Sequence, residues 1–195
     1  MKTPLEPSKY YHIYNHANGK ENLFENEGNY AFFLKRYANF ITPIADTFAY
    51  CLMPNHFHLA IRIKNEDEII KLSEGIAAEK FVSKQFANLF SSYSQAFNKQ
   101  QDRKGSLFIP QFSRKYIDDE DYFRQLILYI HLNSVHHGFT KEIDSWKHSS
   151  FASFFSDKET NLKREEVIDW FGNKEDFLAA HQKELDEKLS LEFEK

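Results

Sequence analysis

Two histidines, His56 and His58, flank one phenylalanine in the stretch CLMPNHFHLAIRIK that spans residues 51–64. Polar and apolar residues alternate from position 56 to 63, and this period of two predicts a half-buried β-strand. Successive side chains of a strand point to opposite faces, so both imidazoles share one face while the apolar residues pack into a core. Imidazole is a common metal ligand, which makes the pair a candidate metal site. A His-x-His pattern taken alone is more often two ordinary strand residues.

A second group of polar residues lies on a predicted helix over residues 119–137. The acidic run 118–121 suits a helix N-terminus, and Gly138 follows where a left-handed cap belongs. Gln125, Tyr129 and Asn133 recur at four-residue steps and therefore line one face, beside an apolar stripe. A helical tyrosine is usually a packing residue, but three polar-tipped side chains in one line make that interpretation less convincing. The histidines at 136 and 137 are interpreted as end-of-helix residues.

The elements that must position these groups follow from the apolar periodicity. Helices are predicted over residues 27–44 and 76–97, with a polar linker before the second, and strands over 10–14, 48–52 and 57–63, with a further extended segment over 106–116. Met53-Pro54-Asn55 is turn-like, so the residues before it form either an adjacent strand or the same strand broken by a bend. This order predicts an α+β ferredoxin-like sandwich, an antiparallel sheet with both long helices on one face. The other face is expected to hold a site or a partner.

Composition limits the classes of protein. A chain of 195 residues suits one domain, and its single cysteine, Cys51, excludes an intramolecular disulfide. No apolar run reaches membrane-spanning length and no signal peptide is recognisable, so we expect a cytoplasmic protein without a membrane partner.

Charge is distributed unevenly along the chain. The formal net charge is −4, yet residues 71–117 carry a local excess of basic residues and the segment after residue 155 is acidic. A basic patch of this kind can meet phosphates although the whole molecule is acidic.

Two longer motifs carry a resemblance to a known family. CLMPNHFHL at 51–59 and LYIHLNSVHHGF at 128–139 resemble the HUH-class single-strand DNA transposases that use one tyrosine. In particular, the chain resembles the REP-associated tyrosine transposases, named for repetitive extragenic palindromes. FSSYSQAFNKQ at 90–100 and SLFIPQFSRKYIDDEDY at 106–122 agree as well, so the resemblance covers nearly the whole chain from residue 10 to 181.

The resemblance implies roles for individual residues. It makes Tyr129 the nucleophile, which forms a 5′-phosphotyrosine with single-stranded DNA, and it makes His56, His58 and Asn133 ligands of a divalent metal. Two imidazoles and one amide oxygen favour Mg or Mn over a closed zinc site. Two departures from the family are Ser134, where a proline is usual, and residues 16–18, where relatives often have an arginine-glycine pair.

The same resemblance gives the rest of the chain a role. Residues 1–155 are expected to form the HUH tyrosine transposase domain, and residues 156–195 an acidic helical extension that packs on it. A DNA hairpin is the expected partner, and five residues are expected to contact it: Arg103, Lys104, Arg114, Lys115 and Tyr116. A solvated charged surface is an equal interpretation of each of these residues.

Three functions remain open at this point. The first is a metal-dependent endonuclease and strand transferase acting at DNA hairpins. The second is a domesticated hairpin-binding protein without turnover, and the third is a hydrolase that uses water while Tyr129 is structural. Intact His56, His58 and Tyr129 favour the first. The pattern does not decide between a monomer and a homodimer.

Overall fold

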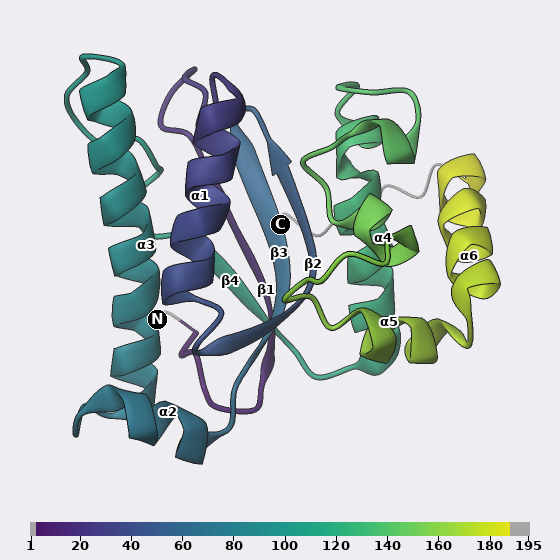
Figure 1. Ribbon diagram of the computed structural model, residues 1–195, viewed down its shortest axis with the longest axis horizontal. Coiled ribbons are helices and arrows are strands. Elements are labelled where there is room, and N and C mark those ends of the chain that lie inside the picture. The colour runs from purple at the N-terminus through teal and green to yellow at the C-terminus, as the bar shows by residue number, and fades with distance from the viewer. Residues whose placement is uncertain (1–2, 188–195) are drawn as a thin grey trace.

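Four antiparallel strands form the sheet at the centre of the computed structural model, which describes residues 3–187 (Figure 1). Along the sheet they run in the order β2 (Ala45–Met53), β3 (His56–Ile63), β1 (Tyr10–His16) and β4 (Ser113–Ile117). The predicted extended segment 106–116 is therefore a strand only in its last part. Since β1 and β3 lie in the middle, they can hold side chains at the centre of either face, whereas β4 is an edge.

The two strands around the histidine motif form a tight hairpin. Met53 pairs with His56, so only Pro54 and Asn55 lie in the turn. Of the two arrangements that the proline allows, the adjacent strand is the correct one. Every residue of β3 except Arg62 is buried, so the prediction of a half-buried strand is wrong. Helices cover both faces of the sheet.

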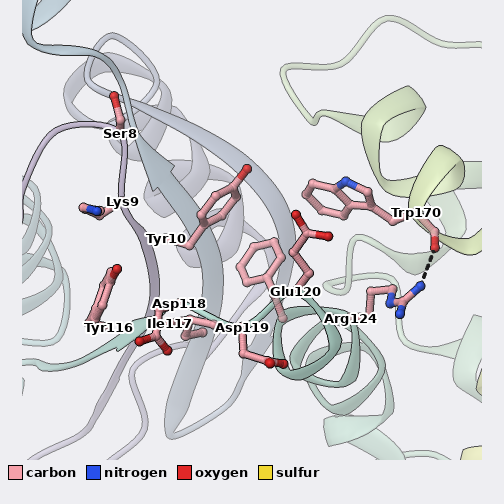
Figure 2. A pocket seen from close by; sticks show the side chains of 11 residues that line it. Ser8, Lys9, Tyr10, Tyr116, Ile117, Asp118, Asp119, Glu120, Arg124 and Trp170 are labelled. Carbon is pink, nitrogen blue, oxygen red and sulfur yellow. Dashed lines mark hydrogen bonds between the residues drawn. The ribbon is translucent and has the colours of Figure 1, made fainter.

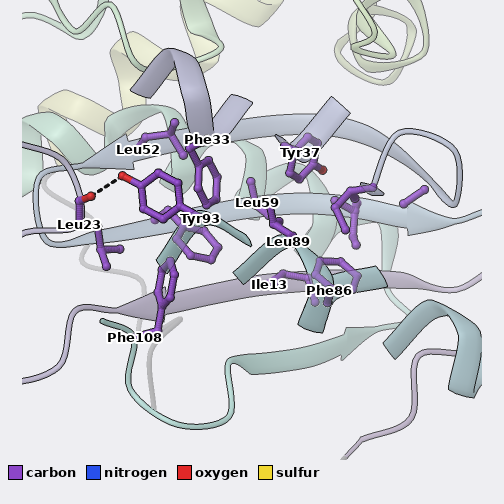
Figure 3. Close-up of a cluster of buried hydrophobic side chains, with 14 of the residues drawn as sticks. Ile13, Leu23, Phe33, Tyr37, Leu52, Leu59, Phe86, Leu89, Tyr93 and Phe108 are labelled. Carbon is purple, nitrogen blue, oxygen red and sulfur yellow. Dashed lines mark hydrogen bonds between the residues drawn. The ribbon is translucent and has the colours of Figure 1, made fainter. Parts of the chain in front are cut away.

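One face is covered by α1 (Glu27–Phe40) and α3 (Ala78–Gln100), the two long helices that the periodicity predicts. Figure 3 shows the core beneath them, where Phe33 and Tyr93 pack edge to face at 5.2 Å and the Tyr93 hydroxyl donates to the Leu23 carbonyl. Burial of these large aromatic side chains drives the packing of both helices.

The prediction of a polar linker before α3 is wrong. Its residues form a short helix, α2 (Glu66–Ser73), which begins with a capping box between Asn65 and Glu68. Each of these side chains accepts from the other residue's backbone N–H, so the helix start is satisfied locally.

The opposite face is covered by α4 (Glu120–His136), which packs on β2 and β3. Asp119 caps this helix by accepting from the Tyr122 N–H, and Gly138 beyond its end has a φ of +72°. Residues 126–134 are all buried, because the sheet lies on one side of α4 and the C-terminal segments lie on the other. The sheet face that was expected to hold a site is therefore covered by α4, the helix that carries Tyr129.

The described part of the acidic segment contains α5 (Arg164–Phe171) and α6 (Lys174–Glu187), preceded by the short 3-10 turns η1 (Ile143–Ser145) and η2 (Phe151–Phe155). Arg62 of β3 pairs with Glu166 of α5 at 2.7 Å, and α6 packs on α4. Residues 188–195 of the predicted extension lie outside the described residues. Across residues 3–187, no helix has the length and apolarity needed to span a bilayer.

Candidate active site

The imidazoles of His56 and His58 lie in the layer between the sheet and α4. Their exposed fractions are 2% and 0%, and their ring centroids are 5.2 Å apart. Fully buried polar rings require partners, so these histidines are not the half-exposed strand residues that a random pattern would give.

Strand β1 brings two more histidines to the same layer. His12 is fully buried, and its Nε2 shares a hydrogen bond of 2.9 Å with His58 Nδ1. His16 stacks on His56 with centroids 4.7 Å apart and planes 9° from parallel. The sequence interpretation missed both residues. A signal exists in the alternation of Tyr10, His12, Tyr14 and His16, but only the pairing of β1 with β3 gives it a meaning.

Helix α4 contributes Tyr129 and, one turn later, Asn133. The Tyr129 ring meets His58 edge to face, with centroids 5.5 Å apart and an angle of 82°. Asn133 Oδ1 lies 3.4 Å from His56 Nε2. The four residues assigned by the resemblance, which are 77 positions apart at the extremes, thus lie in one buried cluster. Gln125, which shares their helix face by spacing, is exposed.

The donor set fits a divalent metal ion. Asn55 Oδ1 lies 2.7 Å from His56 Nδ1, and because an amide oxygen can only accept, Nδ1 carries the proton and Nε2 presents its lone pair. Neighbouring ligands that are each about 2.1 Å from one ion lie about 3.0 to 3.4 Å apart, and His56 Nε2 and Asn133 Oδ1 match the upper value. Among the described residues no three His, Cys, Asp or Glu side chains are grouped to hold a metal. A metal site here therefore depends on the Asn133 amide.

The two histidines at the end of α4 border this cluster. His136 is the last helical residue and His137 is the C-cap, as the interpretation of them as end-of-helix residues expects. The His137 ring lies 4.7 Å from that of His56, and the His136 ring 6.5 Å from that of Tyr129. Burial lowers the pKa of His136, which favours a neutral imidazole beside the phenol.

The predicted DNA contacts on β4 face in two directions. Lys115 pairs across the strands with His12 and therefore projects on the active-site face, where its ammonium lies 5.0 Å from the Tyr122 ring centroid. Arg114 projects on the opposite face over the Phe112 ring at 4.6 Å, and burial lowers its pKa. Tyr116 is 40% exposed. The two basic side chains therefore lie on opposite faces of β4.

The two basic residues after α3 differ in their partners. The Arg103 guanidinium forms an ion pair with Glu21 and a hydrogen bond with the Asn98 side chain, so its charge is already compensated. Lys104 is exposed. The structure thus leaves Lys104 and Lys115 as the more available cations of the predicted set.

Comparisons with known proteins bear on the same layout. No protein-family model matches the chain. A curated protein of Haemophilus influenzae named as a REP-associated tyrosine transposase is 28% identical over 130 residues, which cover 66% of this chain and 68% of that protein. A solved structure of a REP-associated tyrosine transposase bound to a REP hairpin superposes with a TM-score of 0.56 at 16% identity, over 80% of this chain and 84% of that one. The ferredoxin-like α+β fold predicted from the sequence is confirmed, and the chain is similar in sequence and in fold to the REP-associated tyrosine transposases.

Proposed function

We propose that this protein is a metal-dependent single-stranded DNA endonuclease and strand transferase that acts at DNA hairpins through a 5′-phosphotyrosine intermediate. One observation carries the proposal. A tyrosine ring is in edge contact with one histidine of a His-x-His pair, and an amide oxygen one turn further along the helix meets the other histidine. A nucleophile and metal donors in one buried cluster are what phosphodiester transfer requires.

The step balances without an external reagent. The Tyr129 hydroxyl oxygen attacks the scissile phosphorus, the bond from phosphorus to the 3′ oxygen of the preceding nucleotide breaks, and that oxygen leaves as a free 3′-hydroxyl. The phenolic proton is lost to solvent and the leaving oxygen gains one. In the net change, one phosphate ester bond breaks and another forms. The 3′-hydroxyl of a second strand end can reverse the step and join the strands.

The side chains of this site prepare the step. A divalent ion such as Mg or Mn, held by His56, His58 and Asn133, would polarise the phosphate, since an unperturbed phenol with a pKa of about 10 is a weak nucleophile at neutral pH. Asn55 fixes the tautomer of His56, and His12 orients the ring of His58. Lys115 lies on the same sheet face as His12, which supports a contact with a phosphate of the approaching strand.

The solved relative with this fold is bound to a REP hairpin, which supports a hairpin as the DNA partner of this chain too. The fold and the exposed cations suit such a partner. Base pairs of the stem would fix the position of the adjacent single strand, whose phosphate then meets Tyr129.

A denaturing gel tests the proposal. A hairpin oligonucleotide taken from the flanks of the gene, with single-stranded arms and a 3′ label, is incubated with protein and Mn, Mg or chelator. We expect a labelled protein-DNA adduct with metal only, because the fragment on the 3′ side keeps the phosphate that Tyr129 attacks. Tyr129→Phe removes the adduct. Tyr14→Phe, which keeps the ring stacked on His58 at 5.6 Å, retains it.

The other outcomes discriminate between the remaining functions. Cleavage without an adduct, equal in the wild type and Tyr129→Phe, would indicate a hydrolase that uses water. Tight binding without cleavage under any metal would indicate a hairpin-binding protein without turnover.

A further inference from the structure

A cavity of about 450 Å³ opens where the start of β1, the end of β4 and the N-terminus of α4 meet α5 (Figure 2). Of the residues that the sequence assigns to a site, only Tyr116 lines it. Its volume lies in the range of small-molecule binding sites. The cavity is therefore a candidate binding site apart from the cluster of histidines and Tyr129.

Three aromatic side chains from three elements form its inner wall. The Phe123 ring lies edge to face against Tyr10, with centroids 4.8 Å apart, and against Trp170, with centroids 5.5 Å apart. The Tyr10 hydroxyl accepts from Arg62 at 3.0 Å, and the Trp170 carbonyl accepts from Arg124 at 3.0 Å, as the dashed line in Figure 2 shows. Fixed rings of this kind offer a planar ligand a stacking surface at little cost in side-chain entropy.

The outer rim combines one more ring with one cation. Tyr116 is 40% exposed, and the Lys9 ammonium lies 5.8 Å from its ring centroid. Tyr116 belongs to β4, and Lys9 immediately precedes β1, the strand that pairs with β4. The exposed edge of the cavity therefore carries an aromatic ring and a positive charge.

The polar groups of the lining favour a donor rather than an anion. The lining contains three carboxylates, of Asp118, Asp119 and Glu120, and two cations, of Lys9 and Arg124, so its net charge is −1. Asp119 already caps α4 by accepting from the Tyr122 N–H at 2.6 Å, and Arg124 already pairs with Asp121. The carboxylates of Asp118 and Glu120 remain as acceptors for N–H groups, and Lys9 remains as the cation. A phosphate inside the cavity would be repelled, whereas a phosphate at the rim would be attracted.

We propose that this cavity binds one unpaired nucleobase of the single-stranded DNA, an inference that rests on the proposed function. The base stacks on the wall of Tyr10, Phe123 and Trp170, its amino group donates to Asp118 or Glu120, and its phosphate lies near Lys9. Guanine, cytosine and adenine each carry an exocyclic amino group, and thymine does not. The single N–H donor of thymine lies between two carbonyl oxygens, which a carboxylate repels, so the cavity favours an amino-bearing base.

The position of the cavity gives this base a function. Tyr10 and His12 lie on the same face of β1, about 7 Å apart, and Phe123 and Tyr129 are six residues, or about 9 Å, apart on α4. A base held in the cavity thus sets which nearby phosphate can reach the Tyr129 hydroxyl. The cavity selects the cleavage position by the base at a fixed offset from it.

Tryptophan fluorescence tests the proposal directly. The chain has two tryptophans, so Trp146→Phe leaves Trp170 as the single reporter in the cavity wall. The probes are dGMP, dCMP, dAMP, dTMP and deoxyribose 5-phosphate, titrated to millimolar concentration. We expect quenching by the amino-bearing nucleotides, roughly three- to tenfold weaker affinity for dTMP, and no binding of the sugar phosphate.

A double variant identifies the acceptors. Asp118→Ala with Glu120→Ala removes both acceptor groups, so it should keep quenching by all four nucleotides and lose the preference over dTMP. Glu175→Ala, which removes an exposed carboxylate in the first turn of α6, should change nothing. The proposal is overturned if no nucleotide quenches Trp170, if deoxyribose 5-phosphate competes as well as dGMP, or if the preference survives the double variant. Adduct formation by Tyr129 is measured separately. If the adduct forms but the nucleotides do not quench Trp170, only this inference is rejected. If the nucleotides quench Trp170 but no adduct forms, only the proposed function is rejected.

Discussion

The side chain of His12 links the first strand of the sheet to the second histidine of the His-x-His pair. It is fully buried, shares a hydrogen bond of 2.9 Å with His58, and meets the Tyr129 ring edge to face at 6.2 Å. A partner on the second ring nitrogen fixes the orientation of a metal-binding imidazole and raises its basicity. If His58 binds a metal as we propose, His12 is therefore a positioning residue for His58 and does not itself touch the reacting atoms.

Removing this partner should weaken metal binding. We expect His12→Ala to lower the affinity for Mn by about 10- to 100-fold, and His12→Gln, which keeps a hydrogen-bonding group, to recover part of the loss. Isothermal titration calorimetry on the folded proteins without DNA measures this, so the readout is independent of activity. His148→Gln, a histidine stacked on Tyr30 and outside the cluster, is the matched control. An unchanged Mn affinity in His12→Ala would show that His12 only fills space.

At the level of elements, β4 carries its two basic residues on opposite faces. Lys115 shares the face of His12, and Arg114 lies on the other face over Phe112. An edge strand presents both faces near its free side, so a DNA backbone that follows it would meet Lys115 from one face and Arg114 from the other.

The salt dependence of hairpin binding separates these roles. We expect Lys115→Ala to reduce the slope of log affinity against log salt by about one, since one phosphate contact is lost. Arg114→Ala should have the smaller effect, because the guanidinium is desolvated and packed on a ring. Lys158→Ala, an exposed cation before α5, should leave affinity and slope unchanged. If neutralising Arg114 and Lys115 together changes neither quantity, β4 does not contact the DNA.

Helix α6 is held against α4 by a chain of neutral hydrogen bonds. The Phe177 carbonyl can only accept, so His181 Nδ1 donates to it at 2.7 Å and His181 Nε2 accepts from His131 Nδ1 at 2.9 Å. His131 Nε2 then accepts from the Ser150 hydroxyl at 2.8 Å. Burial lowers the pKa of His181 to about 4 and that of His131 well below its ordinary value.

This chain of bonds predicts a pH dependence of stability. Above pH 6.5 both histidines are neutral in the folded and unfolded states, so the full stability is present. As the pH falls from 6.5 towards 4, the unfolded chain takes up protons that the folded chain excludes, and the free energy of unfolding falls. The titration of His181 alone should lower the free energy of unfolding by about 2 kcal/mol between pH 7 and pH 5.

Urea unfolding at the two pH values checks this dependence. Between pH 7 and pH 5, the free energy of unfolding of His181→Phe should fall by about 2 kcal/mol less than that of the wild type. Carboxylates titrate equally in both proteins, so the comparison isolates the histidine. An equal loss in His181→Phe and the wild type would mean that His181 is charged in the folded state.

At the scale of the whole molecule, local patterns could predict elements but not which elements meet. The alternation over 56–63 placed both histidines on one face, and the four-residue spacing placed Asn133 one turn beyond Tyr129. The contact of His56 with Asn133 depends on α4 packing on the second sheet face, which no local period encodes. For the same reason His12 went unnoticed.

Helix α2 was missed on different grounds. Its first turn is acidic, Glu66, Asp67 and Glu68, and its length is only eight residues, so composition suggested a linker. The capping box of Asn65 and Glu68 was the available signal. The assignment of residues 1–155 and 156–195 to a catalytic domain and an extension stays a prediction, as do the catalytic, metal and DNA-binding roles.

The elements of the whole molecule together position the groups that would form the proposed bond between Tyr129 and DNA. The sheet supplies the imidazoles, α4 supplies the phenol and the amide, and α5 with α6 hold α4 in place. We propose that Tyr129 is the residue that becomes joined to DNA.

Peptide mapping of the adduct tests this claim most directly. Trypsin cuts after Arg124 and Lys141, and the peptide between them contains a single tyrosine, Tyr129. After reaction with metal and hairpin DNA and digestion of the DNA to a short remnant, we predict that mass spectrometry finds the nucleotide mass on peptide 125–141, with fragment ions placing it on Tyr129. A nucleotide on any other peptide, or an adduct that persists in Tyr129→Phe, would show that Tyr129 is not the nucleophile.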